Sequence, residues 1–210
     1  LVAGGRLEWL DRPEARSGGA TRMNDAACDP AGRFWAGSMA YAETPGAGSL
    51  YRVDPVRGCE RVLDGLTIAN GIGWSPDART MYLADSGTAR VDAFAFDLAS
   101  GGLTQRRVFA DFGAEPHAPD GLCVDASGTV WIALWGGAGV LGVRPDGARA
   151  ALVDVATPQT TSCAIEPGGS RMAITTAALG LAGDAARPPA GELLLAEVPA
   201  VGQEPALSAL

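Results

Sequence analysis

Three polar residues, Asn24, Asn70 and Asp120, stand at the start of three similar segments of this 210-residue chain. Two amide oxygens and one carboxylate suit a hard or borderline divalent cation such as Ca²⁺, Mg²⁺ or Mn²⁺, and Zn²⁺ tolerates them. If the fold brings the three segments together, the sequence predicts a divalent metal site. One carboxylate supplies little charge, so water and a further protein ligand are expected.

The same residues have a simpler explanation, because Asn-Asp, Asn-Gly and Asp-Gly are common turn dipeptides. A turn accounts for any one of them taken singly. It does not require all three to begin the same strand of a repeat. Their shared register therefore favours the metal site.

The repeat is clearest where residues 24–36 align with residues 120–132. Both segments have Asp at the sixth position, Gly at the ninth and Trp at the twelfth. Residues 70–84 follow the same layout with the aromatic residue one position later, and a fourth copy begins at Thr161. The starts at 24, 70, 120 and 161 are 46, 50 and 41 residues apart. This is the spacing of four-stranded propeller blades.

Two further strands are predicted after each of the first three hairpins, from alternation and β-branched enrichment. They cover residues 49–53 and 60–63, 91–96 and 105–109, and 140–143 and 150–153. A strand pair near Leu7 to Leu10 would finish a preceding blade, and Ala177 to Ala186 reads as an irregular loop. We expect an all-β propeller of about four to four and a half blades, forming one partial domain over residues 1–210. The first strand of each blade would line the central tunnel.

Other residues of the repeat have structural interpretations. Trp35, Trp74 and Trp131 are predicted to be core residues. Asp29, Asp77 and Asp125 are predicted to cap the hairpin turns.

His117, the only histidine, is interpreted as a solvated loop residue, with a substrate contact as the alternative. A Ser-His-Asp triad is disfavoured because no partner serine and no G-x-S-x-G motif are present.

Composition restricts the partners and the compartment. The net charge of −8 disfavours nucleic acid and anionic lipid surfaces but favours cations. No apolar run of 18 residues and no secretory signal are found, so neither a membrane partner nor export is expected. The four cysteines form no C-x-x-C pair and are predicted to be buried reduced thiols, which indicates a cytoplasmic protein.

The motifs resemble those of the gluconolactonase and regucalcin (senescence marker protein) family. The similarity rests on four stretches, in matching order and spacing over roughly residues 18–195: Arg22-Met-Asn24 to Met39, Ala69-Asn70-Gly to Asp77, Pro119-Asp120-Gly to Asp125, and Thr160-Thr-Ser-Cys163. The resemblance implies a six-bladed propeller that hydrolyses sugar lactones with one divalent cation on its axis. Ca²⁺ is the first choice, with Zn²⁺, Mn²⁺ or Mg²⁺ as alternatives.

Site roles also follow from this resemblance. It implies that Asn24, Asn70 and Asp120 are metal ligands and that Asp120 is the general base. It places Arg22 and Asn24 at the substrate hydroxyls and an acidic residue near Glu43. The fourth ligand would be a Glu in blades that precede this chain, so about 80 to 90 residues are expected to be missing.

Three alternatives remain open at this stage. One is a non-catalytic propeller that binds calcium or a protein partner through its top face. Another keeps the fold but replaces the sugar lactone by a phosphotriester or a non-sugar lactone. The last is an inactive fragment.

Overall fold

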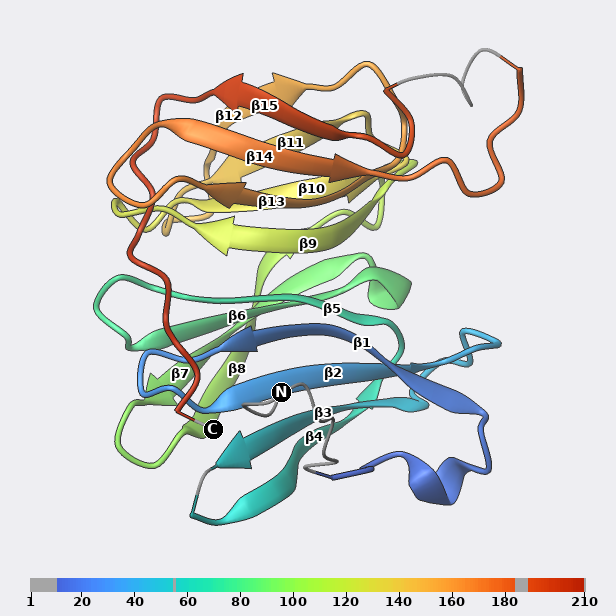
Figure 1. The fold of residues 1–210 in the computed structure, drawn as a ribbon, viewed down its shortest axis with the longest axis vertical. Coiled ribbons are helices and arrows are strands. Elements are labelled where there is room, and N and C mark those ends of the chain that lie inside the picture. Colours follow the sequence, from blue (N-terminus) through green and yellow to red (C-terminus); the bar gives the residue numbers. More distant parts are fainter. Residues whose placement is uncertain (1–10, 55, 184–188, 210) are drawn as a thin grey trace, which may run out of the picture.

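The computed structural model describes residues 11–54, 56–183 and 189–209, which form four antiparallel sheets (Figure 1). Blade I contains β1 (Thr21–Cys28), β2 (Phe34–Ala40), β3 (Gly48–Asp54) and β4 (Gly58–Leu66), and blade II contains β5 (Ala69–Trp74), β6 (Thr80–Asp85), β7 (Arg90–Asp97) and β8 (Gly102–Asp111). Blade III contains β9 (Ala118–Val124), β10 (Val130–Trp135), β11 (Gly139–Val143) and β12 (Arg149–Asp154), and blade IV contains β13 (Thr160–Ile165), β14 (Arg171–Thr176) and β15 (Leu193–Glu197). Short 3₁₀ helices are η1 (Ala15–Ser17) and η2 (Ser86–Thr88).

The sheets are blades of a β-propeller, so the all-β prediction is confirmed. Each sheet follows chain order, and its first strand is an inner strand that packs beside the inner strand of the next blade. The inner strands begin at residues 21, 69, 118 and 160, within three positions of the predicted repeat starts. All six of the further strands predicted in blades I to III are present.

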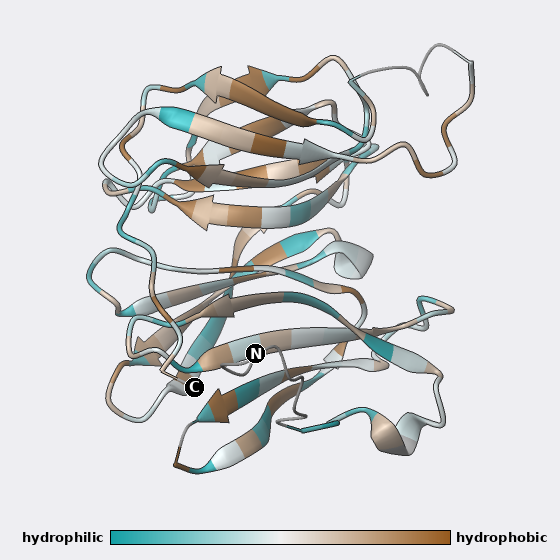
Figure 2. Cartoon of the chain, in the orientation of Figure 1, coloured by the Kyte–Doolittle hydropathy of each residue, from teal (hydrophilic) through white to brown (hydrophobic). Residues whose placement is uncertain are grey.

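Apolar side chains between neighbouring blades form three buried clusters. Figure 2 shows apolar residues concentrated in the strands, where alternate positions face the adjacent blade. The clusters are centred on Trp35, Leu50, Trp74 and Met81 between blades I and II, on Tyr82, Val91, Leu122 and Ile132 between II and III, and on Trp131, Val140, Met172 and Ile174 between III and IV. Trp35, Trp74 and Trp131 are at most 7% exposed, which confirms their core assignment.

Two of the predicted turn-capping aspartates also anchor the core tryptophans. The Asp29 carboxylate accepts hydrogen bonds from the backbone N–H of Ala31 and from the Trp35 indole, at 2.9 and 2.8 Å. Asp125 accepts from the Trp131 indole in the same way, at 2.9 Å. Because both carboxylates are buried, these bonds satisfy groups that would otherwise lack partners.

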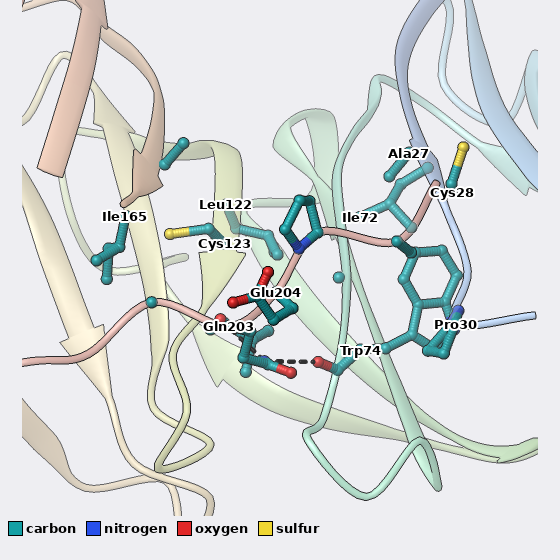
Figure 3. Close-up of a pocket in the computed structure, with 16 residues that line it drawn as sticks. Ala27, Cys28, Pro30, Ile72, Trp74, Leu122, Cys123, Ile165, Gln203 and Glu204 are labelled. Carbon is teal, nitrogen blue, oxygen red and sulfur yellow. Dashed lines mark hydrogen bonds between the residues drawn. The ribbon is translucent and has the colours of Figure 1, made fainter. Parts of the chain in front are cut away.

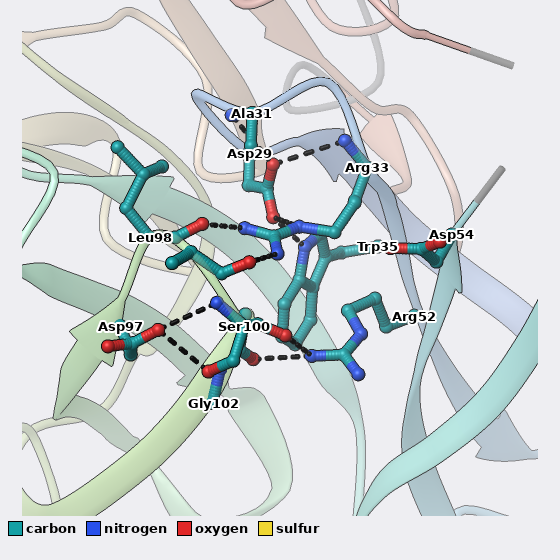
Figure 4. Close-up of polar contacts among 12 residues, drawn as sticks. Asp29, Ala31, Arg33, Trp35, Arg52, Asp54, Asp97, Leu98, Ser100 and Gly102 are labelled. Atoms are coloured by element: carbon teal, nitrogen blue, oxygen red, sulfur yellow. Dashed lines mark hydrogen bonds and ion pairs between the residues drawn. The ribbon is translucent and has the colours of Figure 1, made fainter. Parts of the chain in front are cut away.

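Arginine side chains join blades I and II at their outer turns (Figure 4). Arg33 forms an ion pair with Asp29 at 2.6 Å and donates to the Leu98 carbonyl at 2.7 Å. Arg52 donates to the carbonyls of Ser100 and Gly101, at 2.9 and 2.7 Å. The β7–β8 turn is therefore held against blade I by two buried arginine side chains.

The C-terminal segment, residues 198–209, runs from blade IV back to blade I (Figure 1). Gly202 bridges Asp125 and Pro167, and Gln203 donates to the carbonyls of Trp74 and Val124, at 3.3 and 2.9 Å. At the end of the segment, the backbone N–H of Ala209 donates to the Gly32 carbonyl at 2.9 Å. This segment contacts all four blades.

Several sequence predictions need adjustment or fall outside the described residues. The strand pair near Leu7 to Leu10 lies outside them, as do the last residues of the loop at Ala177 to Ala186. Residues 177–182 contain no helix or strand, as predicted. Of the four free cysteines, only Cys163 is fully buried, so the prediction of four buried thiols was wrong for the other three. Within residues 11–209, excluding the gaps, no helix is long and apolar enough to cross a membrane.

Candidate functional site

The three predicted ligands lie near the start of three adjacent inner strands. Asn24 is on β1, Asn70 on β5 and Asp120 on β9. The Asn24 amide donates to the carbonyl of Ala69 at 3.0 Å, and the Asn70 side chain hydrogen bonds to Asp120. The structure therefore places Asn24 against blade II and Asn70 against Asp120 of blade III.

The turn explanation of these dipeptides is wrong. Asn70-Gly71 and Asp120-Gly121 lie inside strands, and neither glycine has a positive φ. A Cβ on Gly71 would lie 2.7 Å from the Asp120 carbonyl oxygen, and one on Gly121 would meet the Ser162 hydroxyl. Glycine is needed here because neighbouring inner strands approach too closely for a side chain.

Arg22 and Asn24 form a polar pair on β1. The Arg22 guanidinium donates to Asn24 Oδ1 at 2.7 Å and lies 6.0 Å from the centroid of the Tyr41 ring. This arrangement fixes the orientation of the Asn24 amide, because its nitrogen donates to blade II.

Glu43 is exposed in the loop after β2, with φ at 52°. No hydrogen bond or ion pair of its side chain occurs among the described residues.

Supporting residues on blade II were missed in the sequence. Ser86 accepts a hydrogen bond from the Asn70 amide at 3.0 Å and donates to the Pro119 carbonyl at 2.6 Å, next to Asp120. The buried Asp85 carboxylate accepts from the backbone N–H groups of Thr67 and Ile68, at 3.0 and 2.8 Å. The sequence Ala84-Asp85-Ser86 at the end of a strand was the available signal for these polar residues. Their hydrogen-bond partners lie on other strands and are known only once the propeller is known.

Asp25, also missed, gives the site its electrostatic character. Burial and then the neighbouring Asp25 carboxylate raise the pKa of Asp120 from 3.8 to about 7, against the opposing hydrogen bond from Asn70. Burial also raises the pKa of Asp25. The groups that shift Asp120 include no Arg or Lys. Burial and a second carboxyl group thus both raise the pKa of Asp120, and no positive charge among the residues that influence it offsets them.

A pH-dependent stability follows for the metal-free chain. Between about pH 4 and pH 7 the folded state holds a proton on Asp120 that the unfolded state has lost. The free energy of unfolding should therefore fall as the pH rises through this interval and become independent of Asp120 above it. Asp120→Asn should reduce the slope, with Asp25 retaining a contribution of the same sign. Urea denaturation with chelator at several pH values measures this slope. If the free energy of unfolding had the same pH dependence in the unmodified chain and in Asp120→Asn, the expectation would be contradicted.

The donor set fits a divalent cation. The amide oxygen of Asn70 and the carboxylate of Asp120 are hard oxygen ligands, and a cation would supply the positive charge that the two carboxyl groups lack. No cluster of three or more His, Cys, Asp or Glu residues that could hold a metal occurs in the described part of the chain. Binding here would therefore depend on the asparagine amides together with Asp120.

His117 is not the solvated residue that the sequence indicated. Its side chain is 14% exposed, its Nε2 lies 2.9 Å from Glu115 Oε2, and its ring packs 5.8 Å from that of Phe112. The loop is drawn inward because Phe112 is buried. No serine hydroxyl hydrogen bonds to His117 among the described residues, which leaves the triad without support.

Fold and site together define a β-propeller with an oxygen-rich axial site built from the inner strands of successive blades. Residues 2–178 match the family described as SMP-30/Gluconolactonase/LRE-like region. The chain belongs to this family, as the sequence motifs predicted.

Individual relatives support the same assignment. Regucalcin from Sus scrofa is 38% identical over 169 residues, which are 76% of this chain and 56% of the relative. The solved structure of a calcium-binding protein, regucalcin, from Agrobacterium tumefaciens superposes with a TM-score of 0.91 at 32% identity, covering 99% of this chain and 71% of that one. A gluconolactonase from Xanthomonas campestris gives a TM-score of 0.62 at 26% identity, covering 72% and 53%. The chain thus spans little more than half the length of its curated relatives.

Proposed function

We propose that this chain carries the main part of a divalent-metal-dependent lactonase acting on sugar lactones. The observation that carries the proposal is the arrangement of Asn24, Asn70 and Asp120 on adjacent inner strands, with the pKa of Asp120 raised by burial and by Asp25 and by no offsetting Arg or Lys. Similarity to a gluconolactonase supports the substrate class. The match to regucalcin supports Ca²⁺ as the cation.

The residues have distinct roles in this proposal. Asn24, Asn70 and Asp120 would hold the ion, which when bound would polarise the lactone carbonyl and stabilise charge on its oxygen. Asp120 accepts the proton of the attacking water at a carboxylate oxygen. A bound cation would favour the ionised carboxylate, the form that accepts a proton.

Arg22 would position the sugar. Its guanidinium donates to Asn24 Oδ1 and to the Met23 carbonyl through one nitrogen, and a guanidinium carries further N–H donors. A hydroxyl-rich substrate offers acceptors for such donors. Glu43, exposed in the loop after β2, would supply a further substrate contact.

Proton release from several aldonolactones, with added Ca²⁺ and with chelator, tests the proposal on the purified chain. The expected result is turnover that chelator abolishes and Ca²⁺, Mn²⁺ or Zn²⁺ restores. Calorimetric titration with Ca²⁺ is the parallel measurement. Binding of Ca²⁺ without chelator-sensitive turnover would refute the enzyme and favour a calcium-binding propeller instead.

A further inference from the structure

Two cysteine side chains meet between blades III and IV. The Sγ atoms of Cys123 on β9 and Cys163 on β13 are 3.7 Å apart, and Cys163 Sγ also donates to the Trp131 carbonyl at 3.3 Å. Both cysteines are free thiols. The contact joins two strands that share no sheet, since β9 pairs with β10 and β13 pairs with β14.

The backbone explains why these two thiols touch. Gly121 lies two residues before Cys123 and faces Thr161 and Ser162, just before Cys163. A Cβ on Gly121 would be only 2.8 Å from the Thr161 carbonyl oxygen. The inner strands β9 and β13 thus approach each other closely beside the two cysteines. The packing of blades III and IV produces this approach without a disulfide.

One of the two thiols also faces a cavity. Cys123 is half-buried and lines a space of about 230 Å³ between the ends of the inner strands and residues 202–206. Figure 3 shows its side chain pointing from β9 toward Ile165 on β13, with Cys28 on the far side of the cavity. Cys163 is fully buried, and the hydrogen bond with Cys123 together with burial raises its pKa. A small oxidant in the cavity therefore meets Cys123 first.

We propose that Cys123 and Cys163 are a covalent modification site, at which a peroxide-class oxidant forms a disulfide between blades III and IV. The sulfur atoms need to approach from 3.7 Å to the bonded distance of about 2.05 Å, a movement within reach of side-chain rotation and a small strand shift. The proposal is independent of lactone chemistry.

The reaction balances with one hydrogen peroxide. The Cys123 thiolate attacks one peroxide oxygen, the O–O bond breaks, and water leaves after proton uptake, so that Cys123 becomes a sulfenic acid. The Cys163 sulfur then attacks the Cys123 sulfur, displacing a second water as the S–O bond breaks and the thiol proton is transferred. In sum, two thiols are oxidised, one peroxide is reduced, and two waters form.

The other two cysteines provide internal controls. Neither Cys28 nor Cys59 has a thiol partner among the described residues. Burial and Asp11 raise the pKa of Cys59 to about 11, which keeps this thiol protonated and poorly reactive. Cys28 lines the same cavity as Cys123 but has no thiol partner, so oxidation should cross-link only Cys123 and Cys163.

The experiment is a thiol count under denaturing conditions before and after limited hydrogen peroxide, with peptide mapping without reductant. Trypsin cleaves after Arg107, Arg149 and Arg171, which places Cys123 and Cys163 on separate peptides, 108–149 and 150–171. We expect these two peptides to appear as one cross-linked species that dithiothreitol separates. The double variant C28S/C59S should form the same cross-link in a monomer, and adding C163S should abolish it.

The contrary outcomes are equally distinct. Cross-links only between chains, a cross-link that uses Cys28 or Cys59 in place of Cys123 or Cys163, or conversion of Cys123 to an acid that dithiothreitol does not reverse would each overturn the proposal. Circular dichroism should first show that C28S/C59S folds like the unmodified chain. This variant retains both cysteines of the site, so its cross-link can then be interpreted.

Discussion

Asp120→Asn is expected to lower the turnover number for lactone hydrolysis by about 100- to 10,000-fold, the range typical of a lost general base. The amide cannot accept the proton of the attacking water, and it removes the only carboxylate among the three proposed ligands. Asparagine keeps the size of the side chain and can still hydrogen bond to Asn70. Proton release measured over a range of Ca²⁺ concentrations separates lost metal binding from lost chemistry.

Asp64→Asn is the matched control for this change. Asp64 is exposed on β4 and undergoes the same loss of charge away from the axis. It should leave turnover and Ca²⁺ binding unchanged. If Asp120→Asn kept the activity of the unmodified chain at saturating Ca²⁺, the assignment of the base would be wrong.

Asp29→Ala should destabilise the fold by about 3–5 kcal/mol, because the change leaves a buried guanidinium without its counter-charge. Arg33 is 5% exposed, and its ion pair with Asp29 is the closest of its charged contacts. The same change leaves the Trp35 indole N–H without its acceptor. Urea denaturation, followed by tryptophan fluorescence, measures the loss.

The repeat supplies two comparisons for this experiment. Asp125 holds the equivalent position and accepts from the Trp131 indole, but Thr129 replaces the arginine, so Asp125→Ala should cost about 1–3 kcal/mol. Asp77 is exposed, and Asp77→Ala should cost about 0.5 kcal/mol. Equal losses for Asp29→Ala and Asp125→Ala would show that the ion pair with Arg33 contributes nothing.

The repeat made most of the architecture predictable from sequence. Its period fixed the number of blades, and strand-like alternation located the strands that follow each hairpin. The placement of Asn24, Asn70 and Asp120 on adjacent inner strands followed from the fold class, since equivalent positions of successive blades occupy equivalent strands. The close approach at Gly71 did not follow, because the dipeptide Asn-Gly reads as a turn unless the neighbouring strand is known.

Other parts of the site depend on contacts between blades, which no local pattern encodes. Asp25 follows Asn24 directly and looked like part of a turn dipeptide, yet its charge acts on Asp120 of blade III. Ser86 joins Asn70 to Pro119 only because η2 lies against the start of β9. His117 packs against the buried Phe112 ring. This contact could not be predicted from the sequence of the proline-rich loop.

The C-terminal segment has a consequence for how the protein is made. Gln203 donates a hydrogen bond to the carbonyl of Trp74, a residue 129 positions earlier, so this contact cannot form until residue 203 has left the ribosome. Blades I to III can assemble earlier during synthesis, but the carbonyls at the C-terminal ends of β5 and β9 have no such partner until Gln203 is available. Nascent chains stalled before residue 203 should therefore remain sensitive to protease at these strand ends, and should lose this sensitivity upon release.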